Sequence, residues 1–252
     1  MTTALLILAV VFTALMMFGV PVSFSIGIAT LLALFTVTPT PNTALIVSAQ
    51  RVASSLDSFT LVAIPLFILA GGLMNTGGIA MRLIDLAKVL VGWLPGSLAQ
   101  ISVVANALFG AISGSAVASA ASVGATLSPL QRQAGYNMPI CAAANVASSP
   151  CGLLITPSGA LIVYSLISGG TPVDVLFVAG YIPGILMAGS VMVWLAIIAR
   201  RGELPTDVRR YSMNEAAHIF WRALPALAMI AIIMGGIVGG IFTATEAAGV
   251  AA

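Results

Sequence analysis

The sequence predicts an all-α protein that crosses a membrane several times. Of its 252 residues, 60% are hydrophobic and only 6% are charged, whereas a soluble domain usually carries about 25% charged residues. Apolar runs of about 20 residues, long enough to span a bilayer as a helix, recur along the chain. Alternating segments of about 10 residues, which are typical of an outer-membrane barrel, are not evident. These observations exclude a soluble enzyme and favour a polytopic helical bundle.

Prolines delimit the first two expected spans, residues 2–20 and 22–38. Pro21 closes the first span, and Pro39-Thr40-Pro41 closes the second, because proline cannot continue a helix. The first span lacks a basic leader and a small-residue cleavage site, so we expect a retained helix and not a signal peptide. Residues 42–60 mix Arg51 and Asp57 with Ser and Ala, which indicates an amphipathic helix at the interface.

The next segment, residues 61–74, is apolar but short and contains Pro65, so we expect a re-entrant or tilted piece. A second interfacial helix is expected at residues 80–93, before Pro95-Gly96. There Arg82, Asp85 and Lys88 recur every three residues, which places them on one helix face.

A small-residue sequence, Ser113-Gly114-Ser115, lies in the middle of the segment 89–131, which carries no charged residue. Within it, residues 97–131 are long enough for two spans, or for one hairpin that enters and leaves on the same side. Glycine and hydroxyl residues are typical of places where backbones approach closely or a helix turns back.

A second interruption is predicted between Ser148 and Ser158, which separates an Ala-rich helix from an apolar piece that ends near Ile167. Pro150, Gly152, Pro157 and Gly159 fall in this interval, and an uninterrupted helix there would lose hydrogen bonds. A span broken at membrane depth is tolerated only inside protein or beside a cavity.

Residues 175–199 and 223–242 are expected to be ordinary spans. Between them, residues 200–222 hold five of the nine Lys and Arg residues, which predicts a cytoplasmic loop. Thr243 and Glu246 form a capping-box pattern that begins another helix, and we favour this role over proton coupling by Glu246. Because the sequence stops inside that helix, we expect it to be a fragment.

Two breaks in apolar surroundings predict a transporter site. Broken helices free N–H groups that suit a carboxylate, and carbonyls and hydroxyls that suit Na⁺. The alternative is that the small residues only allow close helix packing. We interpret Cys141 and Cys151 as packing residues, and a metal role for the isolated His218 is not expected. The core segments lack an acid, His or Lys for acid–base catalysis, and the net charge of +2 gives no reason to expect nucleic acid.

The sequence resembles the large permease subunit of tripartite ATP-independent periplasmic (TRAP) transporters. The matching motifs follow one another along nearly the whole chain: Ala63-Ile64-Pro65-Leu66-Phe67-Ile68-Leu69-Ala70-Gly71 with Met74 and Gly78-Ile79, residues 109–121, Gly135-Tyr136, Ala147-Ser148-Ser149, Thr156-Pro157-Ser158, Ile182-Pro183-Gly184, Leu224-Pro225-Ala226 and residues 240–248.

The resemblance implies one inverted repeat of an ion-transporter elevator fold, in which a re-entrant hairpin tip faces a broken helix. It implies Na⁺-coupled uptake of a small organic acid such as a dicarboxylate or sugar acid, without another cofactor. The implied partners are a small four-helix membrane subunit and a periplasmic substrate-binding protein, and the implied location is the bacterial inner membrane.

The same resemblance implies the site residues. The residues implied to bind sodium are Ser113, Gly114, Ser115, Ser148, Ser149, Gly152 and Thr156. Those implied to bind substrate are Asn145, Pro157 and Ser158, although Asn145 could instead form an interhelical hydrogen bond. If a cationic side chain binds the carboxylate, Arg132 or a part of the transporter outside this chain should supply it.

Two departures from the family pattern matter. Family members commonly have Pro-Pro-Ser where this chain has Thr156-Pro157-Ser158, and they carry a second, inverted half.

We expect three parts in this chain: a scaffold at residues 1–96, half of a transport domain at 97–170, and spans with the basic loop at 171–252. The alternative function is a truncated, non-transporting membrane scaffold or an inactive fragment.

Overall fold

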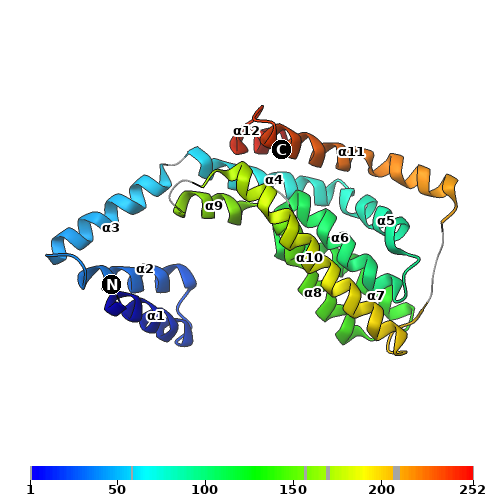
Figure 1. Ribbon diagram of the computed structural model, residues 1–252, viewed down its shortest axis with the longest axis horizontal. Coiled ribbons are helices and arrows are strands. Elements are labelled where there is room, and N and C mark those ends of the chain that lie inside the picture. Colours follow the sequence, from blue (N-terminus) through cyan, green and yellow to red (C-terminus); the bar gives the residue numbers. More distant parts are fainter. Residues whose placement is uncertain (1, 58, 156–157, 169–170, 207–210, 252) are drawn as a thin grey trace. The chain divides into compact units, whose positions relative to one another are not determined.

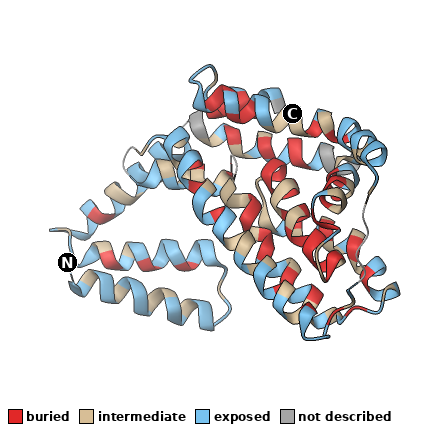
Figure 2. Cartoon of the chain, turned by 45° about the vertical axis from the view of Figure 1, so that its right-hand side comes forward, coloured by how far each residue is buried: buried red, intermediate tan, exposed pale blue. Residues whose placement is uncertain are grey.

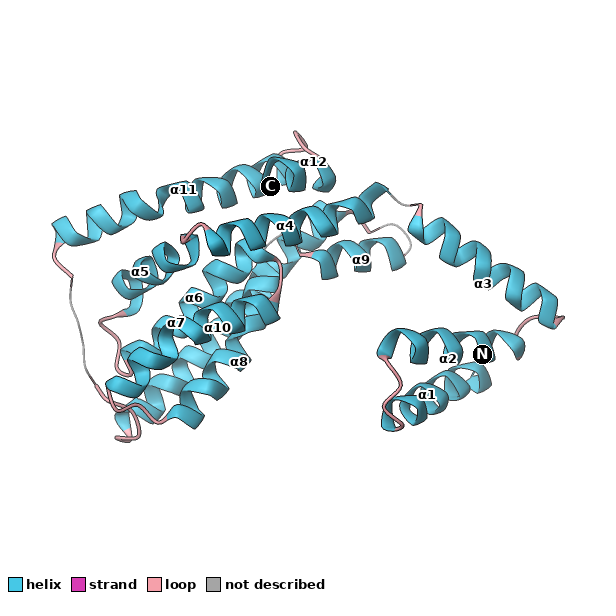
Figure 3. Cartoon of the chain, turned by 180° about the vertical axis from the view of Figure 1, so that it is seen from behind, coloured by secondary structure: helices cyan, strands magenta, loops and turns pink. Residues whose placement is uncertain are grey.

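A computed structural model describes residues 2–57, 59–155, 158–168, 171–206 and 211–251. In these residues the regular structure is helical and no strand occurs (Figure 3), which confirms the predicted all-α class. The chain divides into two compact units, residues 1–58 and 59–252. The predicted division into a scaffold and a transport part is about which helices move together during transport. The two compact units do not test it, so it stays a prediction.

The first unit contains α1 (Thr2–Met17), α2 (Val22–Phe35) and α3 (Pro41–Leu56). A turn with Gly19 at φ 77° joins α1 to α2, a backbone region that suits glycine. The two helices pack where α2 carries the small buried residues Ser25, Ala29 and Ala33. Helix α3 begins at Pro41, and the Thr40 hydroxyl caps it by accepting a hydrogen bond from the Thr43 N–H at 3.2 Å.

The second unit is built around one central helix, α6 (Figure 1). Thirteen of the 17 residues of α6 are buried (Figure 2), and α6 packs against α4, α5, α7, α8 and α10. The elements of the unit are η1 (Phe59–Val62), α4 (Ala63–Thr76), α5 (Ile79–Val91), α6 (Ser97–Ser113), α7 (Ala116–Gln133), α8 (Met138–Ile155), α9 (Gly159–Ile167), α10 (Val173–Arg200), α11 (Met213–Val238) and α12 (Ala244–Ala251).

Three apolar clusters hold this unit together. The first joins α5, α6 and α7 through residues such as Leu83, Phe109 and Leu127. The second joins α4, α9, α10, α11 and α12, and Phe177 is fully buried in it. The third joins α6, α8 and α10, with Leu195 at 0% exposure. Each cluster takes residues from three or more helices, so removing α6 would open two of them.

Long apolar helices support a membrane location. Within the described residues, α8, α10 and α11 are long and apolar enough to cross a bilayer, and α1, α2, α6 and residues 63–73 are shorter apolar helices. Large apolar side chains such as Leu5, Phe24 and Ile182 are 62%, 67% and 70% exposed. Exposed apolar side chains in such number suit contact with lipid better than contact with water.

The predicted interruption between Ser148 and Ser158 is wrong in its first half. Helix α8 continues through Pro150 to Ile155. Proline removes one backbone donor from the helix, and the carbonyl of Val146 loses its partner. The Ser149 hydroxyl donates to that carbonyl at 3.0 Å and replaces the missing hydrogen bond.

The predicted basic loop at residues 200–222 is also too long, since α11 begins at Met213. Ser212 and Glu215 start it with a capping box: the Ser212 N–H donates to Glu215 Oε2 at 2.9 Å, and the Glu215 N–H donates to the Ser212 hydroxyl at 3.3 Å. Two orphan N–H groups are satisfied in this way, so His218 and Arg222 lie on the helix and not in a loop.

The predicted capping box before the last helix is confirmed. The Thr243 N–H donates to Glu246 Oε2 at 2.8 Å, and the Glu246 N–H donates to the Thr243 hydroxyl at 3.3 Å. The charged helix face that was predicted at residues 80–93 lies on α5. There Lys88 Nζ lies 2.8 Å from Asp85 Oδ1, three residues earlier in the helix.

Candidate functional site

The Ser113-Gly114-Ser115 sequence forms the turn of a helical hairpin. Helix α6 ends at Ser113, and Gly114 adopts φ 59° and donates its N–H to the Gly110 carbonyl at 2.9 Å. Ser115 is extended and caps α7, because its hydroxyl accepts from the Ala118 N–H at 3.3 Å. Only glycine enters the left-handed region without steric cost. The chain therefore turns back at this point, which was one of the possibilities left open by the sequence, while the choice between two spans and a hairpin that enters and leaves on one side stays a prediction.

Helix α4 passes close to this turn. A methyl group added to Gly71 would lie 3.0 Å from the Ser113 Cα, which is tighter than an ordinary carbon–carbon contact. Gly71 therefore lets the α4 backbone approach the hairpin tip, and the tip is packed against protein on that side.

The hairpin meets α8 at a pair of glycines. A methyl on Gly110 would lie 2.7 Å from the Gly152 Cα, and a methyl on Gly152 would lie 2.6 Å from the Asn106 carbonyl oxygen. Neither position has room for a side chain. The last turn of α8 therefore packs directly against the end of α6.

The second break lies between α8 and α9. Helix α8 ends at Ile155, and the Ser158 hydroxyl caps α9 by accepting from the Leu161 N–H at 3.3 Å. Thr156 and Pro157, which the sequence assigned to the site, lie outside the described residues. On the α10 side, a methyl on Gly180 would collide with the Leu154 carbonyl, and one on Gly184 would lie 2.6 Å from Ile155 Cγ1. These glycines let α10 pack directly against the end of α8.

A buried polar network lies beside the glycine pair. The Asn106 Nδ2 is 2.9 Å from Asn145 Oδ1, 3.0 Å from the Asn145 carbonyl and 2.8 Å from Ser148 Oγ. The Ser119 hydroxyl donates to Asn106 Oδ1 at 2.8 Å. Asn106, Ser119 and Ser148 are all 0% exposed. The network therefore joins α6, α7 and α8 with direct hydrogen bonds between uncharged groups.

The site residues predicted on α8 have different surroundings. Ser148 and Asn145 face the hairpin and bind Asn106, and Asn145 Nδ2 also donates to the Ala120 carbonyl at 2.9 Å. Asn145 thus makes the interhelical hydrogen bonds that were its alternative interpretation. Gly152 contacts the hairpin through Gly110. The Ser149 hydroxyl instead bonds to the backbone of its own helix.

Arg132 lies far from the hairpin tip. It is in the last turn of α7, which begins at Ala116. At 1.5 Å per residue, the 16 positions between them separate Arg132 from the tip by about 24 Å along the helix. Arg132 is therefore too far away to contact a carboxylate bound at the tip. The expectation that a cationic group comes either from Arg132 or from a part of the transporter outside this chain stays a prediction.

Sequence reasoning missed Asn106, and it included Gly110 and Ser119 only within the motif at residues 109–121, without a role for either. Asn106 is an amide inside the apolar run of α6, and uncharged polar residues in such a run need a partner within the protein. This signal could have identified Asn106. The partners could not have been identified, because Asn145 and Ser148 are about 40 residues away in the sequence.

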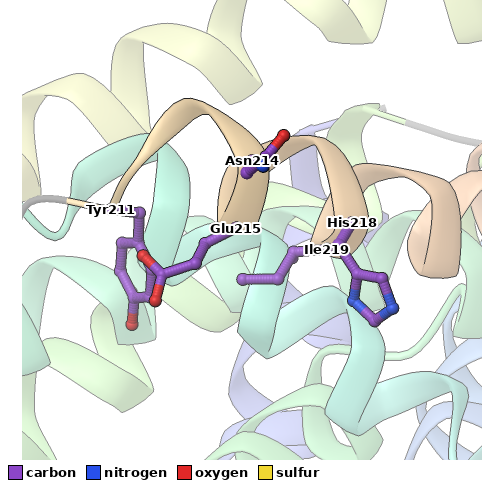
Figure 4. Close-up of a pocket in the computed structure, with 5 residues that line it drawn as sticks. All are labelled: Tyr211, Asn214, Glu215, His218 and Ile219. Atoms are coloured by element: carbon purple, nitrogen blue, oxygen red, sulfur yellow. The ribbon is translucent and has the colours of Figure 1, made fainter.

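Outside the hairpin and α8, the described part of the unit has fewer polar side chains placed together. An open hollow of about 710 Å³ lies at the start of α11 (Figure 4), where Tyr211 precedes the helix, Glu215 lies in its first turn and His218 lies further along it. Across the described ranges, no group of three or more His, Cys, Asp or Glu side chains is placed to hold a metal. Cys141 and Cys151 are buried free thiols on α8, as expected for packing residues.

Comparison with known proteins gives a consistent result. The model of the family described as tripartite ATP-independent periplasmic transporter, DctM component, matches residues 9–252. The chain is 52% identical over 240 residues to YgiK of Salmonella typhimurium, which covers 95% of this chain and 55% of that protein. It is 38% identical to the sialic acid TRAP transporter permease protein SiaT of Haemophilus influenzae, over 100% of this chain and 40% of that protein.

A further relative is the C4-dicarboxylate TRAP transporter large permease protein DctM of Rhodobacter capsulatus, which is 34% identical over 95% of this chain and 56% of its own length. The chain therefore spans about half the length of the relatives it matches.

Proposed function

Because the chain belongs to the DctM component family of tripartite ATP-independent periplasmic transporters, we propose that it forms part of a secondary transporter for small organic acids in the bacterial inner membrane. The family is one of transporter components and not of enzymes. The apolar helices α8, α10 and α11 are the spans that support the membrane location.

The proposed substrate class is a carboxylate. Two relatives are named for sialic acid and C4-dicarboxylates, which are all carboxylic acids. In this chain α7 begins at the hairpin tip and α9 begins after the break, each with a serine cap. Helix N-termini present N–H groups and a positive dipole end, which suits a carboxylate. Ser158, which caps α9, is a proposed contact, and Pro157, outside the described residues, is proposed from the sequence. Asn145 acts through its interhelical bonds.

The proposed coupling ion is Na⁺. In transporters, backbone carbonyls of interrupted helices commonly coordinate Na⁺. The proposed carbonyls come from the turn at Ser113-Gly114-Ser115 and from the segment that follows the end of α8 at Ile155, where Thr156 is proposed from the sequence and lies outside the described residues. Gly152 and Ser148 lie on the α8 face that meets the hairpin, so we place them at the edge of the site. Ser149 belongs to the proposed set by its position, although its hydroxyl is bound to Val146.

The proposed mechanism is an elevator movement of the hairpin and the broken helix, at residues 97–170, against the remaining helices. The proposed partners are a small four-helix membrane subunit and a periplasmic substrate-binding protein, in keeping with the tripartite family description. The observation that carries this proposal is the contact of Gly110 with Gly152, because it brings the end of α6 and the last turn of α8 together.

The test is Na⁺-dependent uptake of an organic acid by the assembled transporter that contains this chain, with its partners. Initial rates are measured against Na⁺ concentration for wild type, Ser115→Ala and Ser148→Ala. Loss of a ligand or cap at the site should raise the half-saturating Na⁺ concentration about tenfold, which corresponds to about 1.4 kcal/mol. Thr126→Ala is the matched control, since its hydroxyl bonds to its own helix at the Ser122 carbonyl.

Two results would contradict the proposal. Uptake at the same rate in Na⁺ and in K⁺ would show that Na⁺ is not the coupling ion. Uptake that persists when this chain is omitted would favour the non-transporting scaffold. Unchanged Na⁺ dependence in both serine variants would remove those two residues from the site.

A further inference from the structure

We propose that Asn106 is a positioning residue, whose carboxamide fixes α8 against the α6–α7 hairpin and so sets the geometry of the proposed Na⁺ site without contacting the ion. This inference rests on the proposed function of that site. It concerns a side chain on α6 that lies outside both interrupted segments.

The Asn106 amide uses both of its ends. On one side Nδ2 donates toward α8, where Asn145 and Ser148 offer oxygen atoms at 2.8–3.0 Å. On the other side Oδ1 accepts from the Ser119 hydroxyl of α7 at 2.8 Å. The opposite orientation of the amide would place Oδ1 against three oxygen atoms, so the hydrogen bonds determine which end is which.

The donors and acceptors on the α8 side also balance. The amide has two protons for three oxygen atoms, and the Ser148 hydroxyl can donate its own proton to the Asn145 carbonyl at 3.3 Å. The two amide protons then serve Ser148 Oγ and Asn145 Oδ1. The polar side-chain atoms of Asn106 and Ser148 thus all have partners within this buried region, which makes the network rigid and costly to break.

The hydrogen bonds form a closed ring through three helices. The ring runs from Ser119 on α7 to Asn106 on α6, then to Asn145 on α8, and returns to α7 at the Ala120 carbonyl, 2.9 Å from Asn145 Nδ2. It therefore starts and ends at adjacent residues. A shift of α8 along the hairpin by one turn, about 5.4 Å, would break the bonds to both α6 and α7.

The Asn106 amide binds Ser148, at the edge of the proposed site, but lies away from the hairpin tip. Asn106 and Ser113 are seven residues apart on α6, which is about 10 Å along the helix. That is too far for the amide to bind an ion at the tip. The Gly110–Gly152 contact lies between the two, so a change in the angle at this crossing would displace the tip from the end of α8.

A second buried amide provides a matched control. Gln131 on α7 is 3% exposed, and its Nε2 donates to the Leu98 carbonyl at 3.1 Å and to Ser102 Oγ at 3.0 Å. Gln131 joins α6 to α7 near the base of the hairpin, and the hydrogen bonds of its Nε2 do not reach α8. Asn106→Asp and Gln131→Glu make the same change, since each replaces a donating NH₂ group with an acceptor oxygen.

The experiment measures two quantities for each variant of the assembled transporter: the Na⁺ concentration that gives half-maximal uptake, and the thermal midpoint of the purified protein. Asn106→Asp should raise the half-saturating Na⁺ concentration about tenfold, while Gln131→Glu should change it less than about twofold. Both variants should lower the thermal midpoint. The thermal midpoint therefore reports the loss of stability, and the half-saturating Na⁺ concentration reports the effect on the proposed site.

Ser119→Ala keeps the inference testable if Asn106→Asp does not accumulate in the membrane. It removes only the hydroxyl that orients the amide, and it should raise the half-saturating Na⁺ concentration about threefold. An unchanged value in Ser119→Ala or Asn106→Asp, or an equal shift in Gln131→Glu, would overturn the positioning role. If wild-type uptake does not respond to Na⁺, the proposed function fails first, and the two failures are thereby distinguished.

Discussion

Gly110 and Gly152 pack backbone against backbone where α6 crosses α8. A methyl group on Gly110 would lie 2.7 Å from the Gly152 Cα, closer than carbon atoms approach in folded proteins. This crossing lets short side chains, such as those of Asn106 and Ser148, reach each other directly. The same closeness makes the crossing intolerant of added volume.

Gly110→Ala is therefore expected to lower the free energy of unfolding by about 1–3 kcal/mol, which is the usual cost of overpacking. The cost arises because the backbone atoms of α8 cannot move aside. Gly189→Ala on α10 is the control, since nothing lies within 4 Å of a methyl there, and alanine favours a helix by up to about 1 kcal/mol. Thermal unfolding in detergent measures both. Equal thermal midpoints for Gly110→Ala and Gly189→Ala would show that α6 and α8 can move apart without loss of stability.

Gln100→Met is expected to change stability by less than about 1 kcal/mol. Gln100 is 0% exposed and donates to the Met192 carbonyl at 2.9 Å, but its Oε1 has no hydrogen-bond partner among the described residues. Loss of one bond is offset by removal of a buried unsatisfied oxygen. Gln131→Met removes two bonds and leaves Ser102 with fewer partners, so it should cost about 1–3 kcal/mol. Unfolding in detergent compares the pair; a larger loss for Gln100→Met would indicate an unseen partner at Oε1.

Ser158→Ala is expected to weaken the start of α9 by about 0.5–2 kcal/mol, the usual effect of removing a serine cap. The Leu161 N–H would lose its acceptor. Amide hydrogen exchange should then become faster in the first turn of α9. Ser168→Ala, at the other end of the same helix, should leave that turn unchanged. Exchange that rises equally throughout α9 in both variants would mean that the cap has no local effect.

The start of α12 should depend on pH through Glu246. The Thr243 N–H, and then its hydroxyl, lower the pKa of the Glu246 carboxyl from its ordinary value of 4.5. A lowered pKa in the folded state means that the cap is fully present above pH 4.5 and is lost as pH falls through the lowered value. Hydrogen exchange at Ala247, corrected for the intrinsic rate, should therefore increase in that acid range. Glu246→Gln cannot ionise and should show no such pH dependence.

The sequence allowed the helical class, the reversal at Ser113-Gly114-Ser115 and the Thr243–Glu246 cap to be predicted. Each of these features is local, since glycine permits a left-handed turn and a hydroxyl three residues before a carboxylate forms a capping box. The capping box at Ser212 and Glu215 has the same pattern, and its omission made the predicted basic loop too long.

Two features were not predicted, for different reasons. Proline and glycine normally indicate a break, but α8 continues through Pro150, where the hydroxyl of Ser149 replaces the lost hydrogen bond within the same helix. The packing of Gly152 on Gly110 and the role of Asn106 depend on residues of other helices. Those pairings are tertiary contacts, so a single sequence contains the residues but not their pairing.

The hydrogen-bonded ring around Asn106 also makes the α6–α7 hairpin dependent on α8. Within the hairpin alone, Ser119 is available to the Asn106 amide, but the acceptors of its two amide protons, on Asn145 and Ser148, are not. An unsatisfied polar group in an apolar interior costs several kcal/mol. The polar interior of the hairpin is therefore completed by the helix that follows it in the chain.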